Sequence, residues 1–287
     1  MANLKNIRSQ IKSVKSIQKV TKAMKMVAAA KLRKSQDNME KARPYSKRIK
    51  QLIVDLTHDI DRSLLPLLNK KGNIDKIGFV IVTADRGLAG SFNTNIIKMA
   101  EQKINKVGKE NSVLFCVGKK GYEYFYKRDY AVKSYYKDFW MNLNYNDAIK
   151  IGNDIVSSYI NNEVDAVNVI YNYFKNVGSQ EVVFEDLLPL DFKNDESLPT
   201  KQDIIYEPSK TGIVKELTPK FFNTQLWQYL LESFASEQAA RMLAMENATV
   251  NAKEMIDDLN LEFNKARQSA ITTEMLEIVG GAEALAN

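Results

Sequence analysis

Apolar residues recur at steps of three and four along the first part of the chain, the spacing typical of one face of an α-helix. This stripe consists of Leu4, Ile7, Ile11, Val14, Ile17, Met24, Val27, Met39, Ala42, Ile49, Ile53, Leu56 and Ile60. A helix of about 55 residues would be roughly 80 Å long, and Pro44 is its one interruption. So long a helix needs a partner to cover its apolar face.

A second stripe of the same period occupies the end of the chain. It begins with Phe222, Leu226, Leu230 and Leu243 and continues through Ala252, Met255, Leu259, Phe263, Ala266 and Ala270. The segment from Lys220 to Val279 contains neither Gly nor Pro, the residues that destabilise helices most. Because a folded middle separates the two stripes, we predict an antiparallel coiled coil, and its period near 3.5 residues predicts a left-handed supercoil.

Strand and helix patterns alternate between these two segments. Apolar strands are predicted at 76–84, 112–117 and 131–135, helices at 93–107 and 145–160, and a hairpin of strands at 166–174 and 180–188. This alternation predicts a mostly parallel sheet that ends in an antiparallel edge. A loop at 191–200 and a last strand at 204–208 would follow, and Gly212 and Pro219 mark the transition to the second long helix. The predicted domains are therefore 1–60, 72–209 and 213–285.

Charge is distributed unevenly along the chain. The first 50 residues contain 15 Lys and Arg but only two acidic residues, whereas residues 220–287 contain five basic and ten acidic ones. Opposite charges favour pairing of the two helices, yet each exposed pair adds only about 0.3 kcal/mol, so the apolar stripes dominate. A basic N-terminus also fits a mitochondrial transit peptide, but the Lys-rich composition and the sustained helical period favour a structural helix.

The basic band on the first helix leaves two interpretations open. It could neutralise nucleic-acid phosphates, or it could be attracted to an acidic protein surface. The band comprises Lys12, Lys15, Lys19, Lys22, Lys25, Lys31, Arg33 and Lys34. The middle of the chain has no recognisable nucleic-acid module, and its tyrosines at 122, 124, 126 and 130 are more typical of packing than of base stacking. Composition alone does not separate the two interpretations.

The segment Thr83–Ser91 joins a predicted strand to a helix, the position of a phosphate-binding turn. It lacks the Gly-x-Gly-x-x-Gly spacing and any Gly-Lys-Ser or Gly-Lys-Thr. We therefore interpret it as a structural turn in which Asp85 pairs with Arg86, and Ser91 or Asn93 caps the helix. A nucleotide-dependent enzyme built on the central sheet is the weaker alternative.

Other catalytic chemistry has little support in the sequence. The single His58 and the single Cys116 are far apart, so neither a metal-ligand cluster nor a Ser-His-Asp set is indicated. A lone Cys cannot form an internal disulfide, and no apolar run is long enough to span a bilayer. We expect no catalysis by the chain alone, and no cofactor or metal.

Five segments resemble, in order, the gamma-subunit family of F-type ATP synthases. They are Ile7–Ile11, Thr21–Lys34, Asp85–Gly90, Ser236–Met245 and Asn264–Thr272. The resemblance covers the whole chain. It implies an α/β fold, with a long antiparallel coiled coil of the N- and C-terminal helices and a Rossmann-like α/β domain that has a mostly parallel sheet and binds no nucleotide.

This resemblance implies a non-catalytic rotor, one copy per complex. The coiled coil would enter a hexamer of three alpha and three beta subunits, and the α/β domain would meet the epsilon subunit and the membrane c-ring. Ion flow would turn ring and shaft, which would drive the beta subunits through states that bind ADP and phosphate, form ATP and release it. The protein would lie on the cytoplasmic face of the bacterial plasma (inner) membrane, or alternatively on the mitochondrial matrix face. The alternative function is a basic coiled-coil protein that binds nucleic acid.

The resemblance also implies a set of rotor–stator coupling residues. Those carried over are Met24, Lys25, Arg241, Arg267, Gln268, Thr272 and Glu274. The first two match a segment near the lever region of the beta subunit, with Arg241 packing nearby. The others match a segment that contacts a beta loop and a sparsely charged tip, residues 270–285, that turns in an apolar sleeve. Lys25 replaces the Glu or Gln of many relatives, Ala89 replaces a Cys, and the regulatory Cys pair of plastid relatives is absent, so we expect no thiol regulation.

Overall fold

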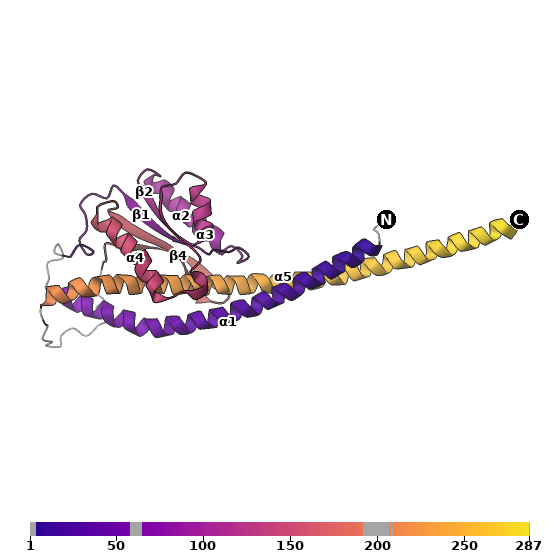
Figure 1. Cartoon of the computed structure of the whole chain (residues 1–287), viewed down its shortest axis with the longest axis horizontal. Coiled ribbons are helices and arrows are strands. Elements are labelled where there is room, and N and C mark those ends of the chain that lie inside the picture. The colour runs from indigo at the N-terminus through magenta and orange to yellow at the C-terminus, as the bar shows by residue number, and fades with distance from the viewer. Residues whose placement is uncertain (1–3, 58–64, 192–206, 208, 287) are drawn as a thin grey trace. The chain divides into compact units, whose positions relative to one another are not determined.

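The chain forms two compact units, each held together by its own contacts. The computed structural model describes residues 4–57, 65–191, 207 and 209–286. The coiled-coil unit comprises residues 1–28 and 242–287, and the sheet unit comprises residues 29–241. The two long helices, α1 (Leu4–Thr57) and α5 (Lys210–Ala286), each contribute to both units (Figure 1).

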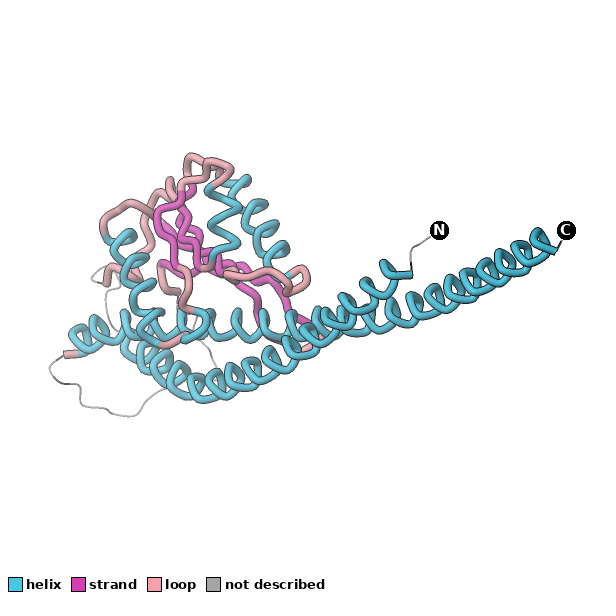
Figure 2. The backbone as a smooth tube through the Cα atoms, turned by 45° about the vertical axis from the view of Figure 1, so that its right-hand side comes forward, coloured by secondary structure: helices cyan, strands magenta, loops and turns pink. Residues whose placement is uncertain are grey.

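The sheet unit contains a five-stranded sheet in the order β3-β2-β1-β4-β5. Figure 2 shows its strands in magenta, with helices beside them in cyan. The strands are β1 (Ile77–Val82), β2 (Ser112–Val117), β3 (Val132–Tyr136), β4 (Ala166–Asn176) and β5 (Ser179–Leu188). The first four are parallel, and β5 runs antiparallel to β4 as a hairpin. The predicted mostly parallel sheet with an antiparallel edge is confirmed.

The shorter helices are α2 (Phe92–Val107), α3 (Lys119–Tyr126) and α4 (Tyr145–Ile160), with a 3₁₀ turn η2 (Trp140–Asn142). Helix α3 was not predicted, because Gly121 within it disfavours a helix locally. Its place is set by a tertiary contact, since the Gly121 amide donates to Thr83 Oγ1 at 2.9 Å. A side chain at this position would come within 2.9 Å of the same oxygen, so the packing itself requires glycine.

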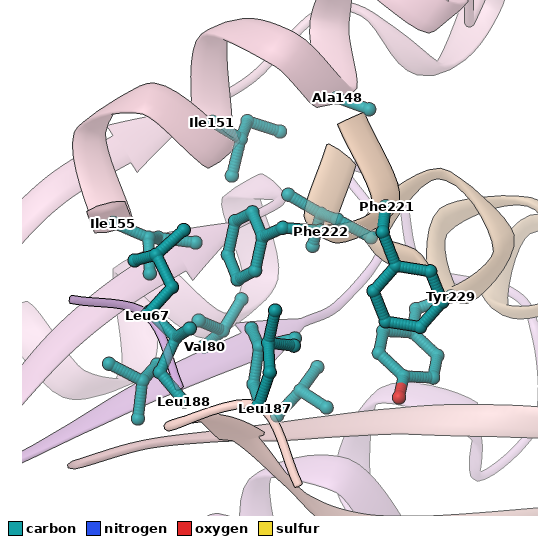
Figure 3. Close-up of a cluster of buried hydrophobic side chains, with 14 of the residues drawn as sticks. Leu67, Val80, Ala148, Ile151, Ile155, Leu187, Leu188, Phe221, Phe222 and Tyr229 are labelled. Carbon is teal, nitrogen blue, oxygen red and sulfur yellow. The ribbon is translucent and has the colours of Figure 1, made fainter. Parts of the chain in front are cut away.

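Two apolar clusters cover opposite faces of the sheet, because alternate residues of a strand point to opposite sides. Val80 and Val82 of β1 belong to a cluster with α4, α5 and the second half of α1. Phe79 and Ile81 belong to the other cluster, with α2 and α3. Figure 3 shows Phe222 of α5 lying among side chains of α4, β1 and β5 in the first cluster. The C-terminal helix is therefore part of the core of this unit.

Helix α5 begins at Lys210, close to the predicted boundary at 213, and it continues through Pro219. Pro219 lacks an amide hydrogen and so removes one helical hydrogen bond. Val214 and Phe222 on either side of it are 0% exposed, and the Thr218 hydroxyl donates to the Val214 carbonyl at 2.6 Å. Burial of these side chains in the core outweighs the local preference against helix.

In the coiled-coil unit the two helices run antiparallel. Thr21 bonds Thr249, Lys25 pairs with Glu246 and Arg8 lies over the ring of Phe263, so residue numbers fall on α5 as they rise on α1. The less exposed positions of α5 are spaced alternately by four and three: Met245, Thr249, Ala252, Ile256, Leu259, Phe263, Ala266 and Ala270. This heptad spacing is the signature of a left-handed coiled coil.

The predicted stripe agrees with the seam at most of its positions, such as Ile11 and Ala252, but it was wrong at three apolar residues. Ile17, Val27 and Met255 are 52%, 56% and 53% exposed. The corresponding less exposed positions on α1 are Gln18, Thr21, Lys25 and Ala28, which keep the steps of three and four. Neighbouring residues of a helix point about 100° apart, so a continuous heptad seam excludes apolar side chains beside it.

Some predicted features lie outside the described residues. These are His58, Ile60, the strand at 204–208 apart from Glu207, and the loop at 191–200 beyond Asp191. The division into domains at 1–60, 72–209 and 213–285 stays a prediction.

Candidate functional site

Open parallel sheets bind ligands beyond the carboxyl ends of their strands, at the point where the strand order reverses. Strands β2 and β4 flank β1 here, so this point lies between β1 and β4. The turn Thr83–Ser91 follows β1 directly and leads into α2. A nucleotide site, if the chain had one, would be expected at this crevice.

The carboxylate of Asp85 lies at the same edge of the sheet, on the side of β2 and β3. It accepts hydrogen bonds from the backbone amides of Lys119 at 2.8 Å and Asp138 at 2.9 Å. Lys119 is the first residue of α3, where free amides attract negative charge. The predicted pairing with Arg86 is wrong, because no described ion pair joins the two residues. Asp85 therefore ties the turn after β1 to the segments that follow β2 and β3.

The predicted capping of α2 is also wrong. Ser91 is the N-cap residue but makes no capping bond through its side chain, and its hydroxyl accepts from the Asn95 side chain instead. Asn93 Oδ1 accepts from the Ala84 amide at 2.9 Å, and its Nδ2 donates to the Arg86 carbonyl at 3.4 Å. Asn93 therefore ties the turn together and fixes it against the end of β1.

Helix α5 fills the crevice. The Arg241 guanidinium donates to the Gly87 carbonyl at 2.7 Å and forms an ion pair with Glu237. The Ser236 hydroxyl donates to the Asn172 carbonyl at 3.1 Å. Ala240 packs against the apolar cluster that contains the residues of the turn. A helix thus occupies the place of a ligand, which accounts for a fold of this type without nucleotide-binding motifs.

Sequence reasoning missed this role for Ser236, Glu237 and Asn172. The segment Ser236–Met245 stood out by resemblance, but its polar residues gave no sign of being buried. Asn172 connects the elements, since its Nδ2 donates to the carbonyl of Phe92 at 3.4 Å. Polar residues within an otherwise apolar helix face and strand were the only available signal.

Cys116 lies on β2 with 0% exposure, in a purely structural setting. Burial raises the pKa of its thiol from the ordinary value of 9.0 to about 12. No group of three or more potential metal ligands occurs among the residues described.

We expect the Cys116 thiol to be unreactive toward iodoacetamide near pH 8 in the folded chain and reactive after unfolding in urea. In the unfolded chain the thiol ionises above its ordinary pKa of 9.0, whereas burial raises the pKa in the folded chain to about 12. The folded state is therefore less stable as the pH rises from 9 to 12, because only the unfolded thiol can lose its proton there. Labelling rates measured by mass spectrometry test this. Equal rates in folded and unfolded protein would contradict the burial of Cys116.

Met24 and Lys25 lie on α1 in the coiled-coil unit, where both side chains are partly exposed. The Lys25 ammonium pairs with Glu246 at 2.6 Å. The Thr21 and Thr249 hydroxyls meet at 2.7 Å, one turn away. A surface groove crosses this seam, lined by Gln18, Lys19, Lys22, Lys25, Glu246, Thr249 and Val250. The middle of the seam is therefore polar, and such a pair adds only about 0.2–1 kcal/mol to stability.

The other predicted coupling residues of this unit lie further along α5, and all are exposed. They are Arg267, Gln268, Thr272 and Glu274. The Thr272 hydroxyl is bonded to its own helix, at the carbonyl of Gln268. Large apolar side chains around them are exposed too: Ile271, Met275, Leu276, Ile278 and Val279. Figure 1 shows α5 continuing past the N-terminal end of α1, so this tip has no partner helix from the described chain.

Arg241 stands apart from this group. It belongs to the sheet unit, and its described partners are Glu237 and the carbonyl of Gly87. Its predicted packing near Met24 stays a prediction. No helix in the described ranges combines the length and apolar content needed to cross a membrane.

Comparisons with known proteins agree over the whole chain. A family model described as ATP synthase matches residues 3–285. The ATP synthase gamma chain of Prosthecochloris aestuarii is 48% identical over 294 residues, covering 99% of each chain. That of Chloroherpeton thalassium is 47% identical over 300 residues, again covering 99% of each.

Solved structures give the same result. The central stalk and c-ring structure of the Tetrahymena thermophila mitochondrial ATP synthase contains a chain with 25% identity and a TM-score of 0.62, covering 80% of this chain and 99% of that one. A chain of the Euglena gracilis mitochondrial enzyme has 23% identity and a TM-score of 0.67, covering 98% and 94%, which is a likeness of fold.

Proposed function

Because the chain belongs to the gamma-chain family of ATP synthases, we propose that its coiled-coil unit turns inside a hexamer of three alpha and three beta subunits. The gamma chain is the central-stalk rotor subunit and is not catalytic. Rotation would present different faces of the helix pair to each beta subunit in turn. Differential contacts would then select the states that bind ADP and phosphate, form ATP and release it.

The exposed surface of the coiled-coil unit is the observation that carries this proposal. Apolar residues such as Ile17, Val27 and Met275 are more than half exposed on a helix pair whose seam is already complete. Large exposed apolar surface on a soluble chain marks a surface that meets another protein. The partnerless tip, residues 271–282, is exposed throughout and suits a bearing within an apolar sleeve.

Within this unit, Met24 and Lys25 are proposed to meet the lever region of the beta subunit. Arg267, Gln268, Thr272 and Glu274 are proposed to contact the stator near the tip, where an exposed guanidinium can bind carboxylates. The ion pair of Lys25 with Glu246 lowers the local positive charge there. Lys25 would therefore act on the stator as part of an ion pair.

The α/β domain is proposed to meet the epsilon subunit and the c-ring. The chain is a subunit of the ATP synthase complex, and the Tetrahymena structure pairs its relative with a c-ring. We place this end at the cytoplasmic face of the bacterial inner membrane, with the mitochondrial matrix face as the alternative. Ion flow through the ring would supply the torque.

The composition of the native complex tests the assembly. A tagged chain, isolated from gently solubilised membranes, should be recovered as one copy with three copies each of two larger ATP-binding subunits, by native mass spectrometry. A free homodimer or a complex with nucleic acid would overturn the proposal.

We expect Arg267→Ala and Gln268→Ala to weaken the coupling of ATP hydrolysis to proton pumping. The fold should stay intact, because both side chains are exposed on α5 and are not part of an apolar cluster. The measurement is the number of protons pumped per ATP hydrolysed in membrane vesicles. Because each substitution removes one contact, we expect this ratio to fall by about tenfold or less. Lys253→Ala, another exposed cation of α5, is the matched control. Unchanged pumping per ATP in both variants would remove them from the coupling set.

A further inference from the structure

A short stretch of α5 in the sheet unit is polar and buried. Its residues are Ser236, Glu237, Gln238 and Arg241, exposed by 0%, 7%, 4% and 9%. We call this stretch, together with its partners Gly87 and Asn172, the joint. Elsewhere in this unit α5 packs mainly with apolar side chains such as Phe222 and Leu230, and Tyr229 adds a hydrogen bond to Glu185. The joint differs from these contacts because it contains a buried ion pair, Glu237 with Arg241.

Glu237 is at the centre of the joint. One carboxylate oxygen pairs with Arg241, and the other accepts a hydrogen bond from Gln238 Nε2 at 2.7 Å. A buried ion pair of this kind usually adds no stability beyond that of apolar residues of similar size, because both charges lose their hydration. Stability therefore does not explain the pair. Its geometric effect is to hold the Arg241 guanidinium on the carbonyl of Gly87.

Directional bonds restrict motion that apolar packing allows. Apolar contacts are non-directional, so a helix held only by them can rotate or shift by small amounts at little cost. Hydrogen bonds weaken steeply once their angles change, and here they reach two different segments, at Gly87 and Asn172. Arg241 is also the last residue of α5 within this unit. The joint thus fixes the rotational setting of α5 where the helix leaves the α/β domain.

We propose that Glu237 and Arg241 are positioning residues that lock α5 to the α/β domain, so that torque passes between them without rotational slip. The crevice that binds ligands in related folds serves here as a mechanical coupling. This inference rests on the proposed rotation of the shaft. In this proposal the joint resists rotation of α5 at this point, whereas the apolar clusters hold the sheet unit together.

The test separates rotational stiffness from folding. The double variant Glu237→Leu with Arg241→Met replaces the pair by apolar side chains of similar size, which preserves stability in comparable cases but removes the bond to Gly87. The complete complex is assembled with a probe attached to a cysteine introduced at the exposed Lys127, and angular fluctuation is recorded during pauses of ATP-driven rotation. Because the hydrogen bond to Gly87 is lost and, within the joint, only the one from Ser236 to Asn172 remains, we expect the angular variance to rise about twofold. Proton pumping per ATP should fall as well.

The matched control removes an exposed ion pair of the same unit outside the joint, by Lys175→Met with Glu181→Leu. Angular variance should stay unchanged there. If the joint variant does not assemble, Arg241→Lys keeps the charge but loses the two-pronged guanidinium, and should show an intermediate variance. Variance equal to that of the unchanged protein in an assembled joint variant would overturn the inference. Absence of ATP-driven rotation in the unchanged protein would instead contradict the proposed function.

Discussion

Gly118→Ala is expected to lower the free energy of unfolding of the full chain by about 3–5 kcal/mol. Gly118 has a φ of 96°, and a Cβ built there would lie 2.0 Å from the Thr83 carbonyl oxygen. Its own amide donates to the Tyr136 carbonyl at 2.8 Å, so the backbone cannot move away without losing a bond between β2 and β3. Urea unfolding followed by circular dichroism measures the change.

Gly72→Ala is the control for this prediction. A Cβ at Gly72 meets nothing within 4 Å, and the position is exposed. The free energy of unfolding should therefore change by less than about 0.5 kcal/mol. Equal effects of the two substitutions would mean that the close approach of β1 and β2 at Gly118 is not part of the folded structure.

Ile256→Asp is expected to separate the two helices of the coiled-coil unit. Ile256 is 7% exposed in the heptad seam, so the substitution both removes apolar contact and buries a carboxylate without a partner. Together these effects cost about 3 kcal/mol or more, a large share of what a short helix pair supplies. Loss of helical circular dichroism at lower urea concentration, and loss of proton pumping per ATP in the complex, are the measurements.

Met255→Asp, at the neighbouring position, tests which of these two residues faces α1, because the stripe predicted from sequence contained Met255 in place of Ile256. Met255 is 53% exposed, so the charge would stay in water and the isolated chain should unfold as before. Destabilisation by Met255→Asp that matches the effect of Ile256→Asp would mean that Met255 also lies in the seam.

The coiled coil shows how far a sequence pattern can be followed. Apolar period and the absence of Gly and Pro were enough to predict two long helices and their pairing. They were not enough to choose between Met255 and Ile256, which are adjacent and both apolar. A partner helix decides that choice, because only one continuous face can be covered along a supercoil.

The candidate site shows a similar division. The turn after β1 was interpreted as structural, because it lacks the spacing of phosphate-binding motifs. Its partners were predicted wrongly, because Asp85 bonds to amides of Lys119 and Asp138, which are 34 and 53 residues away in the chain. Local pairing rules consider only neighbours in sequence. The roles of Glu237 and Asn172 were missed for the same reason.

By itself, the sequence determined the helical ends, the alternating strands and helices of the middle, the opposite charge of the two helical segments and the family. These follow from local propensity, periodicity and motif, which each short segment carries alone. Only the tertiary structure decided that Ile256 and not Met255 lies in the seam, that Asp85 bonds to distant amides, and that α5 packs against the turn after β1. Those features depend on burial against segments distant in sequence, and the free energy of that burial exceeds local preference.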